Sequence, residues 1–221
     1  MKRLKVGRVI PNGVDERIFD WGSQRPEHPG GNGEFNIYSI LEGFGVRKNA
    51  TAAIAAFSIV KRQLPKATFH LVGSGYESDG PAHRWATKNG LDEGCLFRGF
   101  VEQTRLFQEI CGNAHLLLHP SIEESFSMAI LEAAALGVPV VASKNAGGPS
   151  YILDGGRLGC LVDTTSASEI ANGVLRLSRF PLEARARASK CWDNAKMKFT
   201  LTSMTQQYIN FYSDILDHLH L

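Results

Sequence analysis

The chain has few cysteines, and their spacing fits neither of the common structural uses of this residue. Only four of the 221 residues are cysteine, and none belongs to a C-x-x-C pair or has a histidine at metal-ligand spacing. This excludes a compact zinc site and the dense disulfide framework of small secreted domains. The four residues are Cys95, Cys111, Cys160 and Cys191. We therefore expect reduced thiols and a cytoplasmic protein.

Long apolar runs and a strong charge of one sign are also missing. No segment approaches the roughly 20 apolar residues of a membrane-spanning helix, and the basic amino terminus lacks the apolar stretch of a secretory signal. With 24 Lys and Arg against 22 Asp and Glu, the formal net charge is only +2. Because nucleic-acid-binding proteins usually concentrate basic residues on one face, we expect no nucleic-acid partner.

The chain does have enough apolar residues for a full core, 43%, and they follow a repeating pattern. Short, continuously apolar runs alternate with segments of helical periodicity. This alternation is typical of an α/β fold with a doubly wound parallel sheet, here of about six strands in a Rossmann-like arrangement with carboxyl-terminal helices. The expected strands are 36–43, 68–73, 95–99, 114–119, 138–143 and 160–163. The expected helices are 48–64, 81–89, 102–111, 126–136, 167–178, 183–197 and 201–219.

The domain organisation follows from where loop composition is found. Residues 20–35 are rich in Gly, Pro and polar side chains, and no comparable linker follows them. We therefore expect an entry segment and loop over 1–35, one domain over 36–200, and a carboxyl-terminal helix over 201–221. In open parallel sheets, ligands bind beyond the carboxyl ends of the strands, so the segments that follow the strands are the candidate site.

Glu132 is the most informative residue of the helix expected over 126–136. Its neighbours three and four positions away are apolar: Met128, Ala129, Ala135 and Leu136. A carboxylate in these surroundings needs a hydrogen-bonding partner. From the residues alone, two explanations stand at even odds: a distant Arg or Lys reaches Glu132, or Glu132 faces a ligand.

Glu124 lies eight positions earlier, before Ser125, Phe126 and Ser127 at the start of the same helix. One explanation is helix capping, in which a serine accepts a backbone N–H and the carboxylate complements the helix dipole. The other is ligand binding, in which free N–H groups donate to phosphate or sugar oxygens and Glu124 accepts from hydroxyls. Two carboxylates beside a run of donors suit a polyhydroxylated, anionic ligand.

The segment that contains these residues resembles a known protein family. The stretch from Glu124 to Glu132 is similar to the Glu, seven residues, Glu motif of family 4 retaining glycosyltransferases of the GT-B fold, also called glycosyl transferases group 1. Further matches follow in the family's order. They are IPNGVDERIF (10–19), RKN (47–49), HLVGSG (70–75), FRGFV (97–101), HPSIEES (119–125) and VVASKNAGG (140–148). The resemblance covers roughly residues 8–178 and points to the family's carboxyl-terminal, donor-binding domain.

The resemblance implies a role for each matching residue. Lys48, with Arg47 beside it, would neutralise the donor diphosphate, and Glu132 would accept from the ribose hydroxyls. Glu124 and Ser125 would lie by the donor sugar, and the N–H groups of Phe126 and Ser127 would donate to the sugar hydroxyls or to the phosphate. The segment from Gly99 to Val101 would border the nucleobase. Lys48 and Glu124 are the expected catalytic pair, and an exposed lysine in a first helical turn is the alternative for Lys48.

The resemblance also implies an activity and its partners. We expect transfer of a hexose from a nucleoside diphosphate sugar to a hydroxyl acceptor, with retention and without a metal or other cofactor. In this family the acceptor binds to an amino-terminal domain that this chain lacks, and the helix over 201–219 resembles the segment that crosses back to it. The alternatives are a donor-binding subunit without transfer activity, and a sugar-nucleotide epimerase or NAD-dependent enzyme of the same architecture.

Two further features have both a structural and a functional explanation. His119 ends a strand in the expected cleft, where a lone histidine is more often a hydrogen-bonded structural residue than a catalytic one. The basic helix over 183–197, with Arg185, Arg187 and Lys190, is most simply a solvated face, although it could also approach an anionic membrane.

Overall fold

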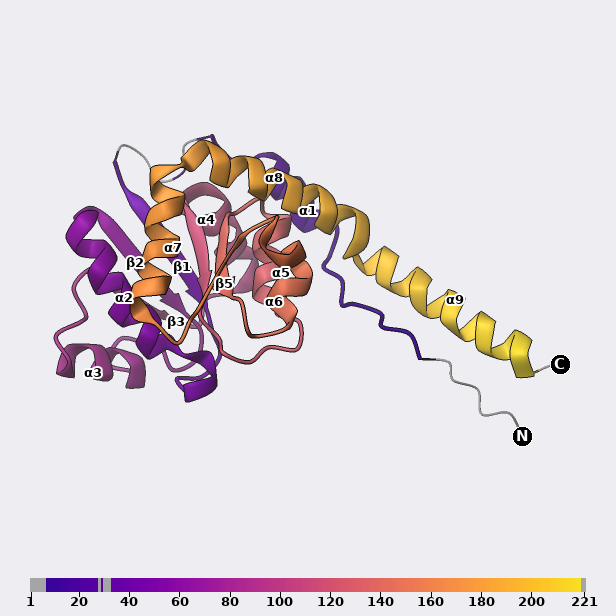
Figure 1. The fold of residues 1–221 in the computed structure, drawn as a ribbon, viewed down its shortest axis with the longest axis horizontal. Coiled ribbons are helices and arrows are strands. Elements are labelled where there is room, and N and C mark those ends of the chain that lie inside the picture. Colours follow the sequence, from indigo (N-terminus) through magenta and orange to yellow (C-terminus); the bar gives the residue numbers. More distant parts are fainter. Residues whose placement is uncertain (1–6, 28, 30–32, 220–221) are drawn as a thin grey trace.

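The structure, a computed structural model, describes residues 7–27, 29 and 33–219 (Figure 1). Parts of the expected entry segment (1–6, 28 and 30–32) and the end of the expected last helix (220–221) lie outside the described residues.

A six-stranded, entirely parallel sheet forms the centre of the domain (Figure 1). Its order, β3-β2-β1-β4-β5-β6, confirms the expected doubly wound topology. The strands are β1 (Phe35–Ile40), β2 (Ala67–Val72), β3 (Cys95–Gly99), β4 (Leu116–His119), β5 (Val140–Ser143) and β6 (Cys160–Val162). Each overlaps its predicted strand, because a strand buried on both faces is predominantly apolar.

Helices cover both faces of the sheet. The helices of the described residues are α1 (Arg17–Ser23), α2 (Ala50–Gln63), α3 (Pro81–Lys88), α4 (Gln103–Asn113), α5 (Met128–Ala135), α6 (Gly148–Ile152), α7 (Ala167–Arg179), α8 (Pro181–Lys198) and α9 (Leu201–Leu219), with short 3-10 turns η1 (Val46–Lys48) and η2 (Asp154–Gly156). Alternate residues of β4 divide the core: Leu116 and Leu118 pack toward α2 and α7, whereas Leu117 packs toward α1, α4, α5 and α8.

The helix α1 corrects the expectation that regular structure begins only after residue 35. Asp15 accepts the backbone N–H of Arg17 at 2.9 Å, which satisfies a free donor at the helix start. Ile18 and Phe19 are buried against the core of α4 and α5. The Gly- and Pro-rich composition further along the segment hid this short helix, whose stability comes from tertiary packing rather than from local propensity.

The five-residue helix α6 was not predicted either, because Gly147 and Gly148 indicate only a turn. Gly148 faces the backbone of Phe126, and a Cβ atom at this position would collide with that backbone. The absence of a side chain therefore lets α6 approach the loop that precedes α5. This close approach helps to define one wall of the site described below.

The backbone conformation at position 73, directly after β2, requires glycine. Its φ is +123°, and a Cβ atom here would collide with the carbonyl oxygen of Leu41. We expect Gly73→Ala to lower the free energy of unfolding by roughly 2 kcal/mol or more, because strain and overlap add. Denaturant titration measures this change.

The matched control for Gly73 is Gly112, which lies inside α4 and has open space where a Cβ atom would stand. Gly112→Ala should stabilise the domain by about 0.5–1 kcal/mol, because Ala is the better helix former. Equal effects of the two substitutions would contradict the conformational argument.

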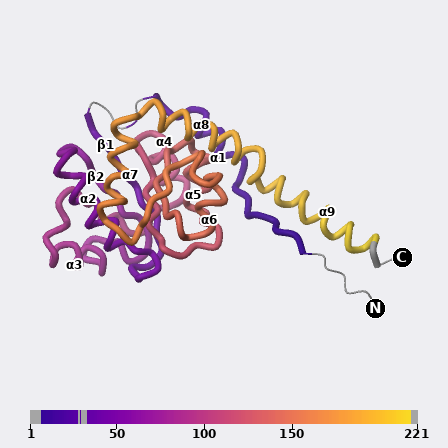
Figure 2. The backbone as a smooth tube through the Cα atoms, in the orientation of Figure 1, coloured from indigo at the N-terminus to yellow at the C-terminus, as the bar shows by residue number. Residues whose placement is uncertain are grey.

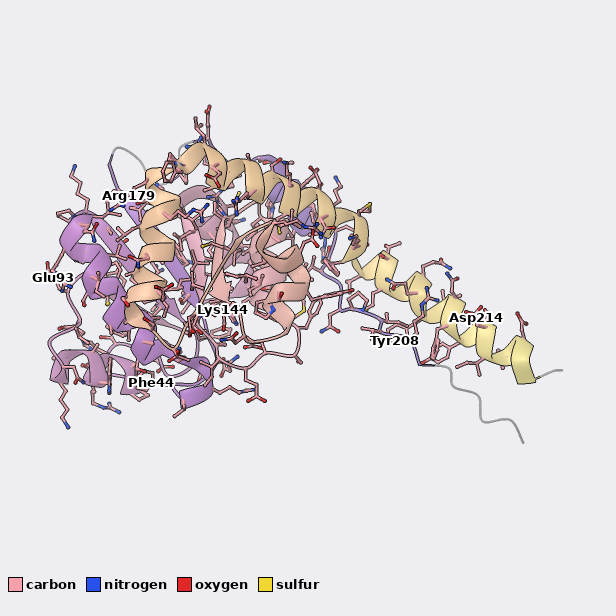
Figure 3. All side chains as sticks on the ribbon, viewed as in Figure 1. Phe44, Glu93, Lys144, Arg179, Tyr208 and Asp214 are labelled. Atoms are coloured by element: carbon pink, nitrogen blue, oxygen red, sulfur yellow. The ribbon has the colours of Figure 1, made fainter. Side chains whose placement is uncertain are left out.

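The helix α9 leaves the domain rather than covering the sheet (Figures 1 and 2). The backbone of Val14 pairs with Phe199 and Leu201, at 2.8 and 2.9 Å, so the amino-terminal segment is bound to the α8–α9 junction. Tyr208 and Asp214 lie on the projecting part of α9 (Figure 3). Within the described part of the chain, no helix is both long and apolar enough to cross a membrane.

Candidate functional site

The doubly wound sheet places a crevice between β1 and β4, whose following connections run to opposite sides. A cleft of about 370 Å³ lies there, at the carboxyl ends of the strands. Its lining comes from the segments after β1, β2, β3 and β4 and from α4 and α5. The lining residues that matter most for its chemistry are Lys48, Val101, Gln103, His119, Glu124 and Glu132.

Lys48 reaches the cleft from η1, after β1. The next residue, Asn49, is left-handed (φ 54°), and its side-chain amide donates to the carbonyls of Pro120 at 3.2 Å and Thr164 at 2.6 Å. The bond to Pro120 joins the lysine segment to the loop that follows β4, and the bond to Thr164 joins it to the segment that follows β6. A sequence separation of more than 70 residues is thereby closed, and Lys48 is held opposite Glu124.

Glu124 forms an ion pair with Lys48, in which Nζ and Oε1 are 2.6 Å apart and both side chains are largely buried. His119 Nε2 is 3.3 Å from the same oxygen. The hydrogen bond from His119, together with the Lys48 pair, outweighs burial and lowers the pKa of Glu124 to about 2. Backbone hydrogen bonds to Ala146 and Gly148 fix the glutamate on the loop. Glu124 is thus an ionised, well-positioned acceptor.

Ser127 is the N-cap of α5, as the capping explanation predicted. Its hydroxyl accepts the N–H of Ile130 at 3.4 Å, and its backbone has a φ of 83°. The same hydroxyl lies 3.2 Å from His119 Nε2. Capping and site architecture are therefore combined in one residue.

Glu132 lines the cleft, and its side-chain partner there is an amide rather than the Arg or Lys of the first explanation. Gln103 of α4, an amide rather than a cation, donates its Nε2 hydrogen to Glu132 Oε1 at 3.1 Å. Burial raises the pKa of Glu132 to about 7, with the Gln103 bond opposing this shift in part. A half-buried carboxylate whose one partner among the described residues is an amide is poised to accept hydrogen bonds from a ligand.

The remaining predicted residues divide between the cleft and its surroundings. Val101 lines the cleft, whereas Gly99 does not and instead hydrogen-bonds Gly73 and Tyr76 through its backbone. Ser125 and Phe126 line a neighbouring pocket of about 440 Å³, which shares Glu124 with the cleft.

Arg47 is exposed and lies outside the lining of the cleft, so the structure does not bring it beside Lys48. In the 3-10 turn, adjacent side chains point in different directions, and only one of the two can face Glu124. The Arg47 backbone carbonyl does contribute, because it accepts the N–H of Ile122 at 3.0 Å.

Of the cleft residues, Phe100 was predicted only as part of the segment from Gly99 to Val101, and Gln103 was not singled out. Phe100 is 83% exposed beside Val101, an unusual position for a large aromatic side chain. Gln103 opens α4 and shows its importance only through Glu132. The exposed apolar residue after a strand was the available signal for Phe100, whereas nothing in the sequence marks Gln103.

The chemistry of the cleft is that of separate charged groups rather than of a metal-ligand cluster. Among the residues that the structure describes, no three His, Cys, Asp or Glu side chains are grouped so as to hold a metal ion. The charged residues that line the cleft are Lys48 and the three glutamates Glu42, Glu124 and Glu132, which come from the segments after β1 and β4 and from α5.

Comparison with curated proteins gives relatives that are enzymes acting on sugars. The chain is 29% identical over 180 residues to a glycogen synthase of Mycobacterium tuberculosis, covering 81% of this chain and 42% of that protein. It is 28% identical over 189 residues to a GDP-mannose-dependent α-(1-6)-phosphatidylinositol monomannoside mannosyltransferase of Mycolicibacterium smegmatis, covering 80% and 48%. The chain thus spans less than half the length of these relatives.

Solved structures show the same architecture. HepE of Anabaena, in complex with UDP and glucose, matches with a TM-score of 0.78 at 25% identity, over 96% of this chain and 58% of that one. A carboxyl-terminal domain of a group 1 glycosyl transferase, LpcC of Francisella tularensis, matches with a TM-score of 0.66 at 20% identity, over 86% and 100%. The latter likeness supports the fold alone.

The family model for glycosyl transferases group 1 matches residues 41–179, which include the cleft residues Lys48, Glu124 and Glu132. The match extends from the end of β1 to the end of α7 and so contains most of the sheet. Together with the Rossmann-like, GT-B-type fold, this match shows that the chain belongs to the glycosyl transferases group 1 family.

Proposed function

We propose that this chain is the donor-binding domain of a retaining glycosyltransferase that moves a hexose from a nucleoside diphosphate sugar to a hydroxyl acceptor. The observation that supports this most directly is the arrangement of Lys48, Glu124 and Glu132 around one cleft at the switch point of the sheet. One cation and two carboxylates match the parts of such a donor: a diphosphate and two polyhydroxylated rings.

Lys48 would bind the diphosphate. Its side chain is only 15% exposed, so its attraction for phosphate oxygens is screened less than that of a surface lysine. As the bond between sugar and diphosphate breaks, negative charge grows on the departing phosphate, and a preplaced cation stabilises that charge. The amino terminus of α5 adds its dipole on the same side. This scheme invokes neither a metal ion nor another cofactor.

Glu132 would accept hydrogen bonds from the ribose hydroxyls, with Val101 bordering the base. A hydroxyl pair that donates to this carboxylate replaces hydration that burial has removed. The UDP complex of HepE, a 25% identical structure, supports a nucleotide in this fold, and the mannosyltransferase relative is named for GDP-mannose. The proposal therefore includes both uridine and guanosine diphosphate sugars.

Glu124 would accept from the hydroxyls of the transferred sugar, with Ser125 and the N–H groups of Phe126 and Ser127 as further contacts. The pocket that shares Glu124 with the cleft offers about 440 Å³ on the far side of this carboxylate. The retaining outcome is proposed from the resemblance of the Glu124-to-Glu132 spacing to the family motif.

The acceptor would bind on an amino-terminal domain facing the cleft. The projecting helix α9 exposes Tyr208, Ile209, Tyr212 and Leu216, a surface suited to packing against such a domain. We propose cytoplasmic action for the full enzyme, and the basic face of α8 offers a route to an anionic membrane surface.

A thermal-shift screen with UDP, GDP, ADP and their sugars tests the donor assignment. A ligand that binds only the native state stabilises it by about 2.7 kcal/mol at 100 times its dissociation constant. For a domain of this size, that corresponds to a rise in Tm of roughly 5–10 °C. We expect one nucleotide class to raise the Tm, and no response to any of them would contradict donor binding.

The second candidate function is a donor-binding subunit without transfer activity of its own. It is favoured by the position of Lys48, Glu124 and Glu132, which lie in the same open cleft of a single domain. Incubating the chain with labelled UDP- and GDP-sugars and an acceptor panel separates the two. Turnover by the chain alone would exclude the subunit, whereas donor binding without turnover would favour it.

A further inference from the structure

His119, the last residue of β4, lies directly beneath the ion pair between Lys48 and Glu124. Its exposure is only 2%, yet the ring borders the cleft. Nε2 lies 3.3 Å from Glu124 Oε1 and 3.2 Å from Ser127 Oγ. The imidazole therefore joins the carboxylate of the loop to the N-cap residue of α5.

The two ring nitrogens of His119 have different surroundings. Nδ1 is buried and has no hydrogen-bond partner among the described residues, whereas Nε2 faces two oxygens. A proton on Nδ1 would leave a buried donor unpaired and place the Nε2 lone pair against a carboxylate. The neighbours therefore assign the proton to Nε2, which donates to Glu124.

Two donors thus converge on Glu124 Oε1, and they differ in their freedom to move. Lys48 Nζ is at 2.6 Å, at the end of a flexible side chain with four methylenes. His119 is fixed by the strand, by burial and by the Ser127 contact. A diphosphate that competes for Lys48 would leave the His119 hydrogen bond in place on the carboxylate.

We propose that His119 is a positioning residue that holds Glu124 in its sugar-binding orientation once Lys48 has turned to the diphosphate. This inference rests on the proposed function, because it assigns the sugar to Glu124 and the diphosphate to Lys48. Without the donor from His119, Glu124 would follow the lysine or turn toward water. The affinity for the sugar would then decrease, whereas the affinity for the nucleotide would not.

The test is a matched pair of substitutions that replace the imidazole ring by a side-chain amide. His119→Gln places its terminal amide near the position of Nε2, whereas the shorter His119→Asn places it near Nδ1 and loses the donor to Glu124. Calorimetry measures Kd for UDP and UDP-glucose, and for GDP and GDP-mannose. The decisive quantity is the ratio of Kd for the nucleotide sugar to Kd for the nucleotide.

We expect His119→Asn to raise this ratio about tenfold, because a hydrogen bond to a charged group is lost only where the sugar binds. The ratio for His119→Gln should stay within about twofold of that of the wild type, since its donor reaches Glu124. His70→Asn, which removes another buried histidine outside the cleft lining, should leave the ratio unchanged.

Each other outcome has a definite meaning. If the wild type binds the nucleotides and His119→Asn leaves the ratio unchanged, or if Gln and Asn raise it equally, the positioning role is wrong while the proposed function stands. If the wild type binds none of the four ligands, the proposed function fails and this inference fails with it.

A second measurement does not depend on the variants folding. In the wild type, the ring signals of His119 followed by NMR should show Nε2 protonated both without ligand and with UDP bound. A shift of the proton to Nδ1, or loss of the Nε2–H hydrogen bond when UDP binds, would overturn the proposal.

Discussion

Replacing Lys48 by methionine should weaken binding of the nucleoside diphosphate by about 10- to 100-fold. A hydrogen bond to a charged group contributes about 1.5–3 kcal/mol, and each 1.4 kcal/mol corresponds to a factor of about ten in Kd. Methionine keeps most of the volume of the lysine stem but removes the cation that lies 2.6 Å from Glu124. Calorimetry with UDP and GDP measures the change.

The effect of Lys48→Met has two physical parts. The phosphate loses its cation, and Glu124, whose charge Lys48 balances in the empty cleft, now repels the diphosphate. The double variant Lys48→Met with Glu124→Gln should therefore recover part of the lost affinity. No recovery would show that repulsion from Glu124 makes no contribution.

Lys88→Met is the matched control for charge. Lys88 is exposed at the end of α3 and does not line the cleft, so this variant removes the same charge from the protein without touching the site. Its Kd should equal that of the wild type. Equal losses in both variants would reduce the Lys48 effect to overall electrostatics and would contradict the phosphate role.

Replacing Glu132 by glutamine should stabilise the empty domain above neutral pH and weaken donor binding. The pKa of Glu132 is raised from 4.5 to about 7 in the folded state by burial. Between these pH values the folded state holds a proton that the unfolded chain has released. Stability conferred by this group is therefore present below about pH 4.5 and is lost as the pH rises through 7.

Glutamine cannot ionise, so Glu132→Gln avoids this loss while its side chain still reaches Gln103. Allowing for solvent screening, we expect the variant to gain roughly 2 kcal/mol at pH 8, or about 4–8 °C in Tm, and close to nothing at about pH 4.5. Thermal unfolding at the two pH values measures the gain. A gain that is equal at both would contradict the ionisation argument.

The same variant should bind the nucleotide about tenfold more weakly, because an amide oxygen is a poorer acceptor than a carboxylate for ribose hydroxyls. Stability and binding then change in opposite directions at one residue, as is common where a site is built from strained or desolvated groups. Glu93→Gln is the control. Glu93 is exposed, does not line the cleft and lies on the side of the domain away from α9 (Figure 3), so its substitution should change neither stability nor binding.

The sequence was sufficient for the sheet because its strands are predominantly apolar. All six strands and the doubly wound topology followed from short apolar runs separated by helical periodicity. Helix boundaries were less exact, since α5 begins at Met128, two residues after the expected start. Ser127 determines that boundary through its capping hydroxyl, a contact that depends on backbone geometry.

Glu132 shows where local reasoning reached its limit. Its apolar neighbours correctly marked it as a carboxylate in need of an explanation, but the partner is an amide from α4, 29 positions away. Arg47 is the second example, because proximity in the sequence did not place its side chain in the cleft. It stands next to Lys48 in the sequence, yet it is exposed outside the cleft lining.

By itself the sequence determined the α/β class, the parallel sheet and the edge of the sheet at which the cleft lies, because these depend on periodicity and on residues near one another in the chain. Only the tertiary structure decided that Lys48, His119 and Glu124 meet at one oxygen. That meeting requires β1 and β4 to be neighbours and Asn49 to join their loops. Side-chain distances across such long separations are set by packing, which no local pattern encodes.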